Sequence, residues 1–455
     1  MFGSSKARMV GGIRSFLTQP GYSFLREFFA AMTAKSESSE IHPDENLVEA
    51  AGHESATAHS QQYLETPRLG EPFLLTPGPL TTAFSVKEAM LRDWGSWDED
   101  FRSMTRHIRD ELLSMIDDQN NEFDCVPMQG SGTFAVESMM GSLLPRNGKA
   151  LVLANGAYGQ RCARTLAYLG RSHVVIDKGD YLPPRGDEVR LALRNDPDIT
   201  HVIAIHCETS SGILNPLEEI SEATYGEGRL LLIDSMSAFG ALPVKASQLR
   251  FEALVSSANK CIEGVPGFGF VIARKAALQA AKGCCHSLSL DLHDQWSHME
   301  KTGQWRFTPP THSVAAFIKA LSLHRAEGGV VGRGNRYRRN RDILVSGMRH
   351  LGFETLLRDR WLSPIIVTFF NPADEQFVFT RFYELMKEKG FIIYPGKLTE
   401  VESFRIGCIG QLDGNAMSNV VDAAAASLQS MGVRSASPPE KAFAEREKLN
   451  KQSEH

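Results

Sequence analysis

The sequence lacks any apolar run of about 20 residues, which is the length that a helix needs to cross a bilayer. It also lacks a marked excess of charge, because 49 Lys and Arg residues against 54 Asp and Glu residues give a net charge of −5 at pH 7. A chain without a basic excess has no general attraction to nucleic acid or to an anionic membrane surface. We therefore expect a protein that binds neither nucleic acid nor a membrane.

Cysteine is sparse and shows no ligand spacing. The chain has 7 cysteines, and only Cys284 and Cys285 are adjacent. Their positions match neither a metal-ligand pattern nor a disulfide framework, and no Ser/His/Asp hydrolase signature is present. These absences predict no metal site and favour a reducing compartment.

The first 70 residues differ in composition from the rest of the chain. The first 26 carry four basic residues and no acid, and residues 36–70 are polar. This pattern is typical of an organelle transit peptide followed by a linker without a core. Residues 1–70 are therefore predicted to be a disordered extension that targets mitochondria. The alternative is a cytoplasmic protein whose extension carries no targeting signal.

The middle of the chain alternates short apolar runs with helical patterns. With 455 residues, 42% of them hydrophobic, it is long enough for two or three domains. Runs of this kind predict strands buried on both faces, and their alternation with helices predicts an α/β fold with a mainly parallel sheet flanked by helices. We assign this large domain to residues 71–325. The predicted strands are 150–155, 172–177, 200–206, 229–234, 253–258 and 268–273.

The pattern of apolar and charged residues changes after Lys319. A basic helical stretch at 332–352 is followed by further apolar runs and by a helix with one apolar face. Residues 326–433 are therefore predicted to form a smaller α+β domain. The remaining residues 434–455 are charged and interrupted by proline, and we expect a disordered tail.

A glycine turn opens one of the predicted helices. Gly130, Ser131, Gly132 and Thr133 lead directly into a helical pattern. The free N–H groups and the dipole at a helix start attract anions, and hydroxyl groups can add donors. The turn is therefore predicted to bind a phosphate group.

The same turn also matches a dinucleotide-binding pattern. Gly130, Gly132 and Ala135 have the spacing G-x-G-x-x-A. A dinucleotide site also needs an acidic residue at the end of the next strand, and that strand ends in Asn155. A nicotinamide-dependent enzyme is therefore an alternative of lower weight.

Two neighbouring predicted strands end in groups of opposite charge. Asp234 ends the run 229–234, and Lys260 closely follows the run 253–258. The carboxyl edge of such a sheet is where ligands bind. Asp234 could instead cap a helix, and Lys260 could be a solvated surface charge. Together with the phosphate turn, however, an acid for a ring nitrogen and a lysine for an aldehyde are the groups that hold pyridoxal phosphate.

Other polar residues follow the ends of predicted strands. Tyr158 could stack on a cofactor ring or be ordinary packing. Glu208 and Thr209 are candidates for the cofactor's phenolic oxygen and for polar contacts near it. His206, in the same stretch, is more simply a structural histidine.

With these residues in place, the chain resembles the class V, fold-type I pyridoxal-phosphate aminotransferases from about Leu74 to Val433. The resemblance rests on eight ordered motifs. They are "LLTPGPLTT", "DWGSWDEDF", "MQGSGTFAVESM", "NGAYGQR", "HCETSSGILNPL", "IDSMSAFGA", "SANKCIEGVPGFGF" and "FRIGCIG".

The resemblance implies roles for particular residues. Lys260 would be the Schiff-base lysine and Asp234 the partner of the pyridine nitrogen of pyridoxal 5′-phosphate. Thr308 would reach the phosphate of a neighbouring subunit, which implies a homodimer, and Arg405 would bind the acidic group of the substrate. The remaining cofactor contacts would come from Ser131, Gly132, Thr133, Tyr158 and Thr209.

The resemblance also implies a reaction. The motifs are similar to those of transaminases that move the amino group of 2-aminoethylphosphonate to pyruvate during phosphonate degradation. An exchange of the alanine–glyoxylate or serine–pyruvate type is the nearest alternative. A cysteine desulfurase would need a reactive cysteine, whereas Cys408 lies in a strand-like stretch, and a binding protein that retains the fold without turnover is the alternative outside enzymes.

Overall fold

The structure is a computed structural model that describes residues 70–396 and 401–452. The predicted extension and its targeting signal therefore lie outside the described residues, except for Gly70.

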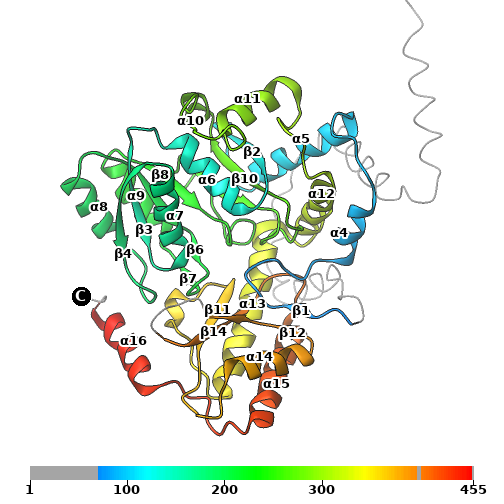
Figure 1. Cartoon of the computed structure of the whole chain (residues 1–455), viewed down its shortest axis with the longest axis vertical. Helices are drawn as coiled ribbons and strands as arrows, with labels where there is room; N and C mark the ends of the chain where they lie inside the picture. Colours follow the sequence, from blue (N-terminus) through cyan, green and yellow to red (C-terminus); the bar gives the residue numbers. More distant parts are fainter. Residues whose placement is uncertain (1–69, 397–400, 453–455) are drawn as a thin grey trace, which may run out of the picture. The chain divides into compact units, whose positions relative to one another are not determined.

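A seven-stranded sheet forms the centre of the large domain (Figure 1). Its strand order is β2-β10-β9-β8-β5-β3-β4, and all neighbouring strands are parallel except for β10, which is antiparallel to both β2 and β9. The predicted α/β fold with a mainly parallel sheet is confirmed. The strands are β2 (Phe123–Gln129), β3 (Lys149–Ala154), β4 (Ser172–Asp177), β5 (Ile199–Ile205), β8 (Leu230–Asp234), β9 (Ala253–Ser257) and β10 (Phe268–Arg274).

The two edge strands depart from the sequence prediction. β4 is not buried on both faces, because both of its ends are exposed and no residue in it is fully buried. At the other edge, β2 was not predicted at all. It contains Pro127, which cannot donate a ladder hydrogen bond and is tolerated because β2 has only one neighbour.

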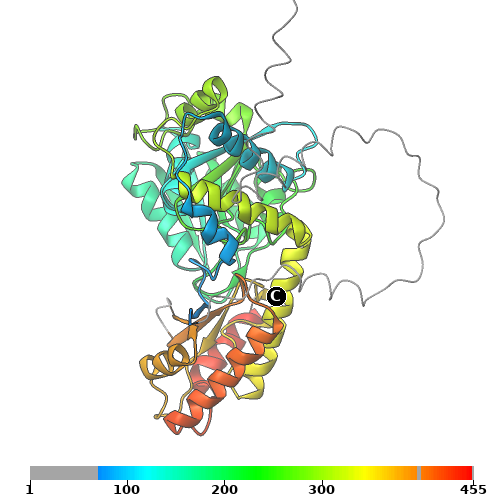
Figure 2. The ribbon, with the colours of Figure 1, turned by 90° about the vertical axis from the view of Figure 1, so that its right-hand side faces the viewer.

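Helices lie on both faces of the sheet (Figures 1 and 2). Two of them begin at its carboxyl edge: α6 follows β2, and α7 follows β3. The helical segments of the large domain are α4 (Phe84–Glu88), η2 (Ala89–Leu91), α5 (Glu99–Ser114), α6 (Gly132–Leu143), α7 (Ala157–Tyr168), α8 (Gly186–Asn195), α9 (Leu217–Gly226), α10 (Lys275–Ala280), α11 (Leu292–Thr302) and α12 (Thr311–Ala326).

The long helix α13 (Gly329–His350) leads from the large domain into the small one (Figure 2). There β14 (Ser403–Gly407) pairs on either side with β11 (Ile366–Phe370) and β13 (Tyr394–Pro395). Two helices, α14 (Phe379–Glu388) and α15 (Gly414–Met431), complete the α+β arrangement, and the short segment η3 (Asp359–Trp361) precedes β11.

The first described strand belongs with the small domain. β1 (Phe73–Leu74) pairs in parallel with β12 (Phe391–Ile392), and Leu75 is fully buried in the apolar cluster of that domain. The assignment of residues 71–75 to the large domain is therefore corrected.

The segment after residue 433 is also corrected, because it contains α16 (Glu440–Gln452) where a disordered tail was expected. Ala442 is buried, and Arg446 donates from Nη1 to the carbonyl oxygen of Thr355 at 2.6 Å. The guanidinium of Arg446 also lies 4.3 Å from the centre of the Phe443 ring. The charged composition of this segment thus conceals one face that packs on the small domain.

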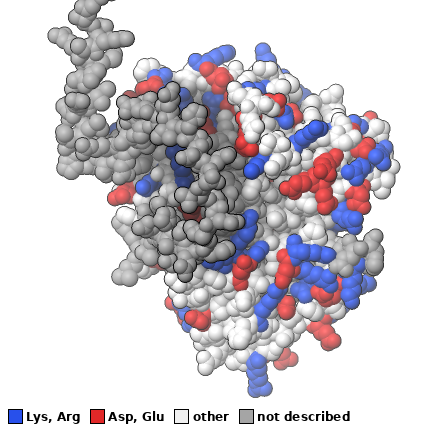
Figure 3. All heavy atoms as spheres, turned by 180° about the vertical axis from the view of Figure 1, so that it is seen from behind, with Lys and Arg blue, Asp and Glu red and all other residues white. Residues whose placement is uncertain are grey.

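Over residues 70–396 and 401–452, no helix is both long and apolar enough to cross a membrane. On the face drawn in Figure 3, acidic and basic side chains are interspersed over the part of the surface that is not grey. This pattern agrees with the small net charge of the sequence.

Candidate active site

Asp234 and Lys260 come from adjacent parallel strands. Asp234 is the last residue of β8 and pairs in register with Val255 of β9, and Lys260 follows the end of β9. Each of the two side chains lies close enough to influence the pKa of the other. The structure therefore brings the predicted acid and amine together at the carboxyl edge of the sheet.

The Lys260 amine lies in a poorly solvated position. Burial lowers its pKa to about 8, and the nearby Asp234 carboxylate opposes this effect. Its Nζ donates a hydrogen bond to the carbonyl oxygen of Pro77 at 2.5 Å. An amine with this pKa is partly neutral near physiological pH, which a nucleophile or a general base requires.

Asp234 is buried and forms no ion pair within the described residues. Burial raises its pKa to about 6; the N–H of Met236, which donates to Oδ1 at 2.9 Å, opposes the rise, and nearby Glu208 adds to it. A buried acid of this kind gains stability from a cationic partner.

The start of α6 has no cap from the protein. Gly130 adopts a φ of +100°, and the N-cap residue Ser131 makes no side-chain capping bond. Within the described residues, no group accepts a hydrogen bond from the backbone N–H of Gly132 or Thr133. The side chains of Ser131 and Thr133 are exposed at the same turn. The predicted phosphate site is thus an open helix start with its donors available.

The start of α7 is arranged in the opposite way, because Glu208 occupies it. One oxygen of Glu208 accepts from the N–H groups of Tyr158 and Gly159 at 3.0 and 3.1 Å. The other accepts from the N–H and the hydroxyl of Ser210 at 3.2 and 2.5 Å. The prediction that Glu208 contacts the cofactor's phenolic oxygen is wrong, because both oxygens are already engaged by the protein.

Thr209, the other candidate for that contact, has a different environment. It is 1% exposed, and its hydroxyl has no hydrogen-bond partner. Buried hydroxyls without a partner are uncommon in folded proteins. The Thr209 hydroxyl is therefore available to a ligand that enters this site.

Arg405 lies on β14 of the small domain and contacts the backbone of Thr209. Its Nε donates to the carbonyl oxygen of Pro395 at 3.0 Å, and its Nη1 donates to the carbonyl oxygen of Thr209 at 2.8 Å. It is 3% exposed, burial lowers its pKa, and no acidic side chain of the described residues forms an ion pair with it. A buried guanidinium held by two carbonyl groups is suited to an anionic ligand.

Arg161 is a residue of the site that the sequence did not reveal. Its guanidinium lies 4.8 Å from the centre of the Tyr158 ring, and its Nη1 lies 3.4 Å from the hydroxyl of Thr133. It is also close enough to influence the pKa values of Lys260 and Asp234. The spacing of three residues from Tyr158 on a helix is the signal that could have predicted it.

Thr308 and His206 lie outside this cluster of polar contacts. Thr308 is exposed, and its carbonyl oxygen accepts from Nε2 of Gln129 at 3.4 Å, just before the phosphate turn. His206 is buried beside Ser235, with Nδ1 2.9 Å from its hydroxyl, and burial lowers its pKa to about 4. A neutral, hydrogen-bonded histidine agrees with the structural role expected for it.

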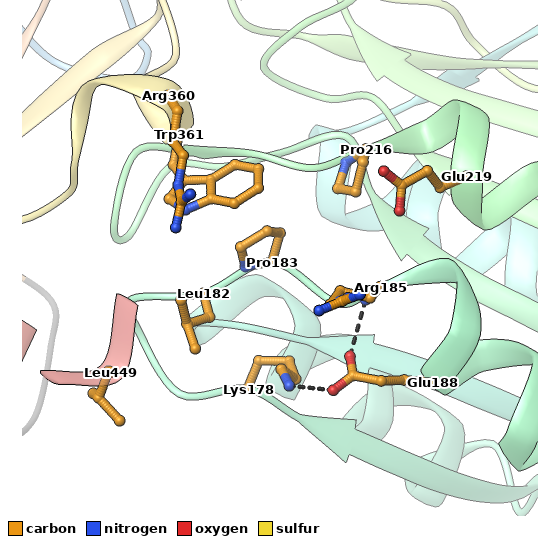
Figure 4. Close-up of a pocket in the computed structure, with 10 residues that line it drawn as sticks. All are labelled: Lys178, Leu182, Pro183, Arg185, Glu188, Pro216, Glu219, Arg360, Trp361 and Leu449. Carbon is orange, nitrogen blue, oxygen red and sulfur yellow. Dashed lines mark hydrogen bonds and ion pairs between the residues drawn. The ribbon is translucent and has the colours of Figure 1, made fainter. Parts of the chain in front are cut away.

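A separate hollow of about 590 Å³ contains none of the predicted site residues (Figure 4). Lys178 and Arg185 both contact Glu188 in it, and Trp361 and Leu449 come from the small domain and α16. The described residues contain no group of acidic, histidine and cysteine side chains that could hold a metal ion, and all 7 cysteines are unpaired.

Comparison with known proteins places this geometry in a family. The family of class-V aminotransferases matches residues 95–380, and the chain belongs to this family. It is 71% identical over 381 residues to the 2-aminoethylphosphonate–pyruvate transaminase of Rhizobium meliloti (strain 1021), with 84% of this chain and 100% of the relative covered. It is 67% identical over 383 residues to 2-aminoethylphosphonate–pyruvate transaminase 1 of Paraburkholderia xenovorans (strain LB400), with coverage of 84% and 98%.

The fold is shared with more distant aminotransferases. The crystal structure of pyridoxamine–pyruvate aminotransferase from Mesorhizobium loti superimposes with a TM-score of 0.74 at 20% identity, covering 86% of this chain and 100% of that one. At this identity the likeness concerns the fold alone. It agrees with the fold-type I architecture that the motifs implied.

Proposed function

We propose that the protein is a pyridoxal-phosphate-dependent transaminase that moves the amino group of 2-aminoethylphosphonate to pyruvate, giving phosphonoacetaldehyde and L-alanine. The observation that carries this proposal is the pair Lys260 and Asp234 beside an uncapped helix start, in a chain 71% identical to a transaminase of that name. The products place the reaction in phosphonate degradation.

The residues present fit pyridoxal phosphate. The free N–H groups of Gly132 and Thr133, with the Ser131 and Thr133 hydroxyls, would hold its phosphate. The unpartnered hydroxyl of Thr209 would donate to the phenolic oxygen of the cofactor. The ring of Tyr158 would stack on the cofactor ring. When bound, the cofactor supplies an aldehyde carbon and a ring that takes up the electron pair left by the substrate proton.

The side chains of the protein then have separate tasks. Lys260 would take the proton from the substrate carbon and deliver it to the cofactor carbon that carries the transferred amino group, because burial has brought its pKa to about 8. The Asp234 carboxylate keeps a proton on the ring nitrogen by pairing with it. Arg405 holds the acidic group of the substrate through the donors that its two carbonyl partners leave free.

The substrate pair is supported by the names of the relatives rather than by the arginine itself, because a guanidinium accepts phosphonate and carboxylate alike. The decisive experiment measures L-alanine from pyruvate with 2-aminoethylphosphonate, alanine or serine as the donor. We expect 2-aminoethylphosphonate to be the best donor and Lys260→Ala to be inactive, with the exposed-lysine control Lys282→Ala unchanged. Equal activity of the parent and Lys260→Ala would contradict the mechanism, and no alanine from the parent would contradict the substrate assignment.

Two further proposals concern the oligomeric state and the subcellular location of the protein. We propose a homodimer in which Thr308 reaches the partner's phosphate site, supported by its exposed position next to the phosphate turn. We also propose that residues 1–70 direct the protein to mitochondria. A fluorescent protein fused to residues 1–70 should then accumulate there, whereas an even cytoplasmic distribution would contradict this address.

A further inference from the structure

Two helices begin at the carboxyl edge of the sheet, and their first N–H groups are satisfied differently. The first N–H groups of α6 are left for a ligand. In α7, the N–H of Ala157 donates to the hydroxyl of Ser210 at 2.9 Å, and those of Tyr158 and Gly159 donate to Glu208. At α7, an acidic side chain of the protein stands where an anionic ligand could bind.

Burial raises the pKa of Glu208, but its hydrogen bonds oppose this rise and favour the ionised carboxylate. All four groups within hydrogen-bonding distance are donors, namely three N–H groups and the hydroxyl of Ser210. The Ser210 hydroxyl accepts from Ala157, so its own proton is directed at Glu208. A protonated carboxyl would have a proton without an acceptor here. The side chain is 0% exposed, so water does not share these bonds.

Glu208 belongs to a small hairpin that contacts both domains. The hairpin pairs β6 (Cys207–Glu208) with β7 (Ile213–Leu214), and its turn is closed by a bond of 2.8 Å from the N–H of Gly212 to the carbonyl oxygen of Glu208. The N–H of Ser363 in the small domain donates to the carbonyl oxygen of Gly212 at 3.0 Å. A Cβ added at Gly212 would lie 2.8 Å from the carbonyl oxygen of Ile366, so the turn packs directly on β11.

One carboxylate therefore connects three residues of the site. It holds the backbone of Tyr158 through α7, and its sequence neighbour is Thr209. The carbonyl oxygen of Thr209 in turn accepts from Arg405. A shift of the Glu208 carboxylate would move the aromatic ring and the free hydroxyl relative to each other.

We propose that Glu208 is a positioning residue that sets the Tyr158 ring and the Thr209 hydroxyl for the cofactor, acting through these two residues without touching the cofactor itself. The inference rests on the proposed function only in that it requires pyridoxal phosphate to bind. Glu208→Gln tests it, because the amide keeps the volume but replaces one acceptor oxygen with an NH₂ group that faces donors.

Two measurements separate positioning from general stability. In the cofactor-free protein, the amides of Tyr158 and Gly159 should exchange with solvent at least about tenfold faster in Glu208→Gln than in the parent. Titration with pyridoxal phosphate should give a Kd about 10- to 100-fold higher, the range expected for a lost hydrogen bond to a charged group. Asp291→Asn is the matched control, because Asp291 caps α11 with a bond of 3.0 Å from the N–H of Asp294. It should leave the Kd and the α7 amides unchanged.

A mutant cycle then tests the route. In a Tyr158→Ala, Thr209→Val background, Glu208→Gln should change the Kd less than about twofold, because the residues through which it acts are gone. If Glu208→Gln does not fold, Ser210→Ala removes the bridging hydroxyl and should raise the Kd about threefold to tenfold.

The proposal would be overturned if Glu208→Gln raised the Kd equally in the parent and in the Tyr158→Ala, Thr209→Val background. An unchanged Kd despite faster amide exchange would overturn it as well. Neither readout needs turnover. A parent that binds pyridoxal phosphate but forms no alanine would therefore contradict the proposed function and leave the test of Glu208 valid.

Discussion

The amine of Lys260 donates a hydrogen bond to the carbonyl oxygen of Pro77, 183 positions earlier in the chain, at 2.5 Å. Pro77 belongs to the segment that follows β1. Backbone atoms of Leu75 and Thr76 in this segment lie against Gly407, the last residue of the strand β14 that carries Arg405, and the backbone of Thr81 lies against Gly410 just after it. The absence of a side chain at these two glycines thus allows the backbone of residues 75–81 to approach them closely. This segment joins the catalytic lysine to the small domain.

Gly78→Ala should disable Lys260 without unfolding the protein. A Cβ at Gly78 would lie 2.6 Å from Nζ of Lys260 and 2.9 Å from its Cδ, so the side chain must move. We expect alanine formation to fall at least about 100-fold, because a displacement of about 1 Å can cost that much. Gly390→Ala is the control for backbone strain, since its φ is +90° and its Cβ would meet nothing within 4 Å. Equal activities of the two variants would contradict the role of this contact.

Asp234→Asn should change how the stability of the cofactor-free protein depends on pH. Because the folded pKa of about 6 lies above the ordinary aspartate value of 3.8, the folded state binds more protons than the unfolded state between these values. The Asp234 contribution is therefore fully present below about pH 4 and is lost as the pH rises through about 6. Above pH 6 the free energy of unfolding of Asp234→Asn should exceed that of the parent by up to roughly 3 kcal/mol. Urea unfolding from pH 4 to 8 measures the difference in unfolding free energy between the two proteins. A difference that stays constant across this range would contradict the raised pKa of Asp234.

The central part of the site could be predicted because its residues follow strong local patterns. Asp234 and Lys260 follow apolar runs that can only be strands, and parallel neighbouring strands end at the same edge. The phosphate turn was visible for the same reason, since glycine and hydroxyl residues directly precede a helical pattern. In each case the chemistry depends on residues that are close in sequence to the element that places them.

The errors concern contacts between distant segments. The role of Glu208 depends on α7, which starts 51 positions before it, and no local pattern predicts that pairing. The packing of α16 depends likewise on Arg446 and the distant Thr355. β2 was missed because Pro127 weakens a strand pattern, and only its place at the sheet edge makes the proline acceptable.

Arg405→Lys should weaken substrate binding more than it slows the chemical step. Lysine keeps the positive charge but loses the fork of donors that holds the Pro395 and Thr209 carbonyl groups while binding an anion. We expect KM for 2-aminoethylphosphonate to rise about 10- to 100-fold with a smaller change in kcat. Steady-state rates measure this split. A large loss of kcat at unchanged KM would indicate that Arg405 acts mainly through Thr209.

Arg336→Ala should destabilise the protein through the buried charge that it leaves. Arg336 and Arg333 share the buried carboxylates Glu263 and Glu327, so removal of Arg336 leaves two buried acids with one cation. The N–H of Glu263 donates to the carbonyl oxygen of Lys260 at 2.7 Å. Removing one partner of a buried ion pair costs roughly 3–5 kcal/mol. Arg381→Ala is the control, because its pair with Glu384 is exposed and such pairs contribute about 0–1 kcal/mol. Urea unfolding compares the two variants, and equal midpoints would contradict the prediction.

Phe307→Glu should weaken the proposed homodimer. Phe307 is 41% exposed next to Thr308, and Leu91 and Trp97 are 84% and 73% exposed on a segment that meets the same region through a contact of 3.0 Å between Asp93 and His312. Exposed apolar side chains beside Thr308 are candidates for burial against a partner subunit, and a charge placed at Phe307 would oppose that burial.

Sedimentation velocity should show a dimer for the parent and a shift toward monomer for Phe307→Glu, with loss of activity because Thr308 no longer reaches the partner's phosphate site. Leu191→Glu places the same charge at another exposed apolar position, 61% exposed on α8, and should remain dimeric. A monomeric parent with full activity would contradict both the dimer and the role of Thr308, since each site would then be complete within one chain.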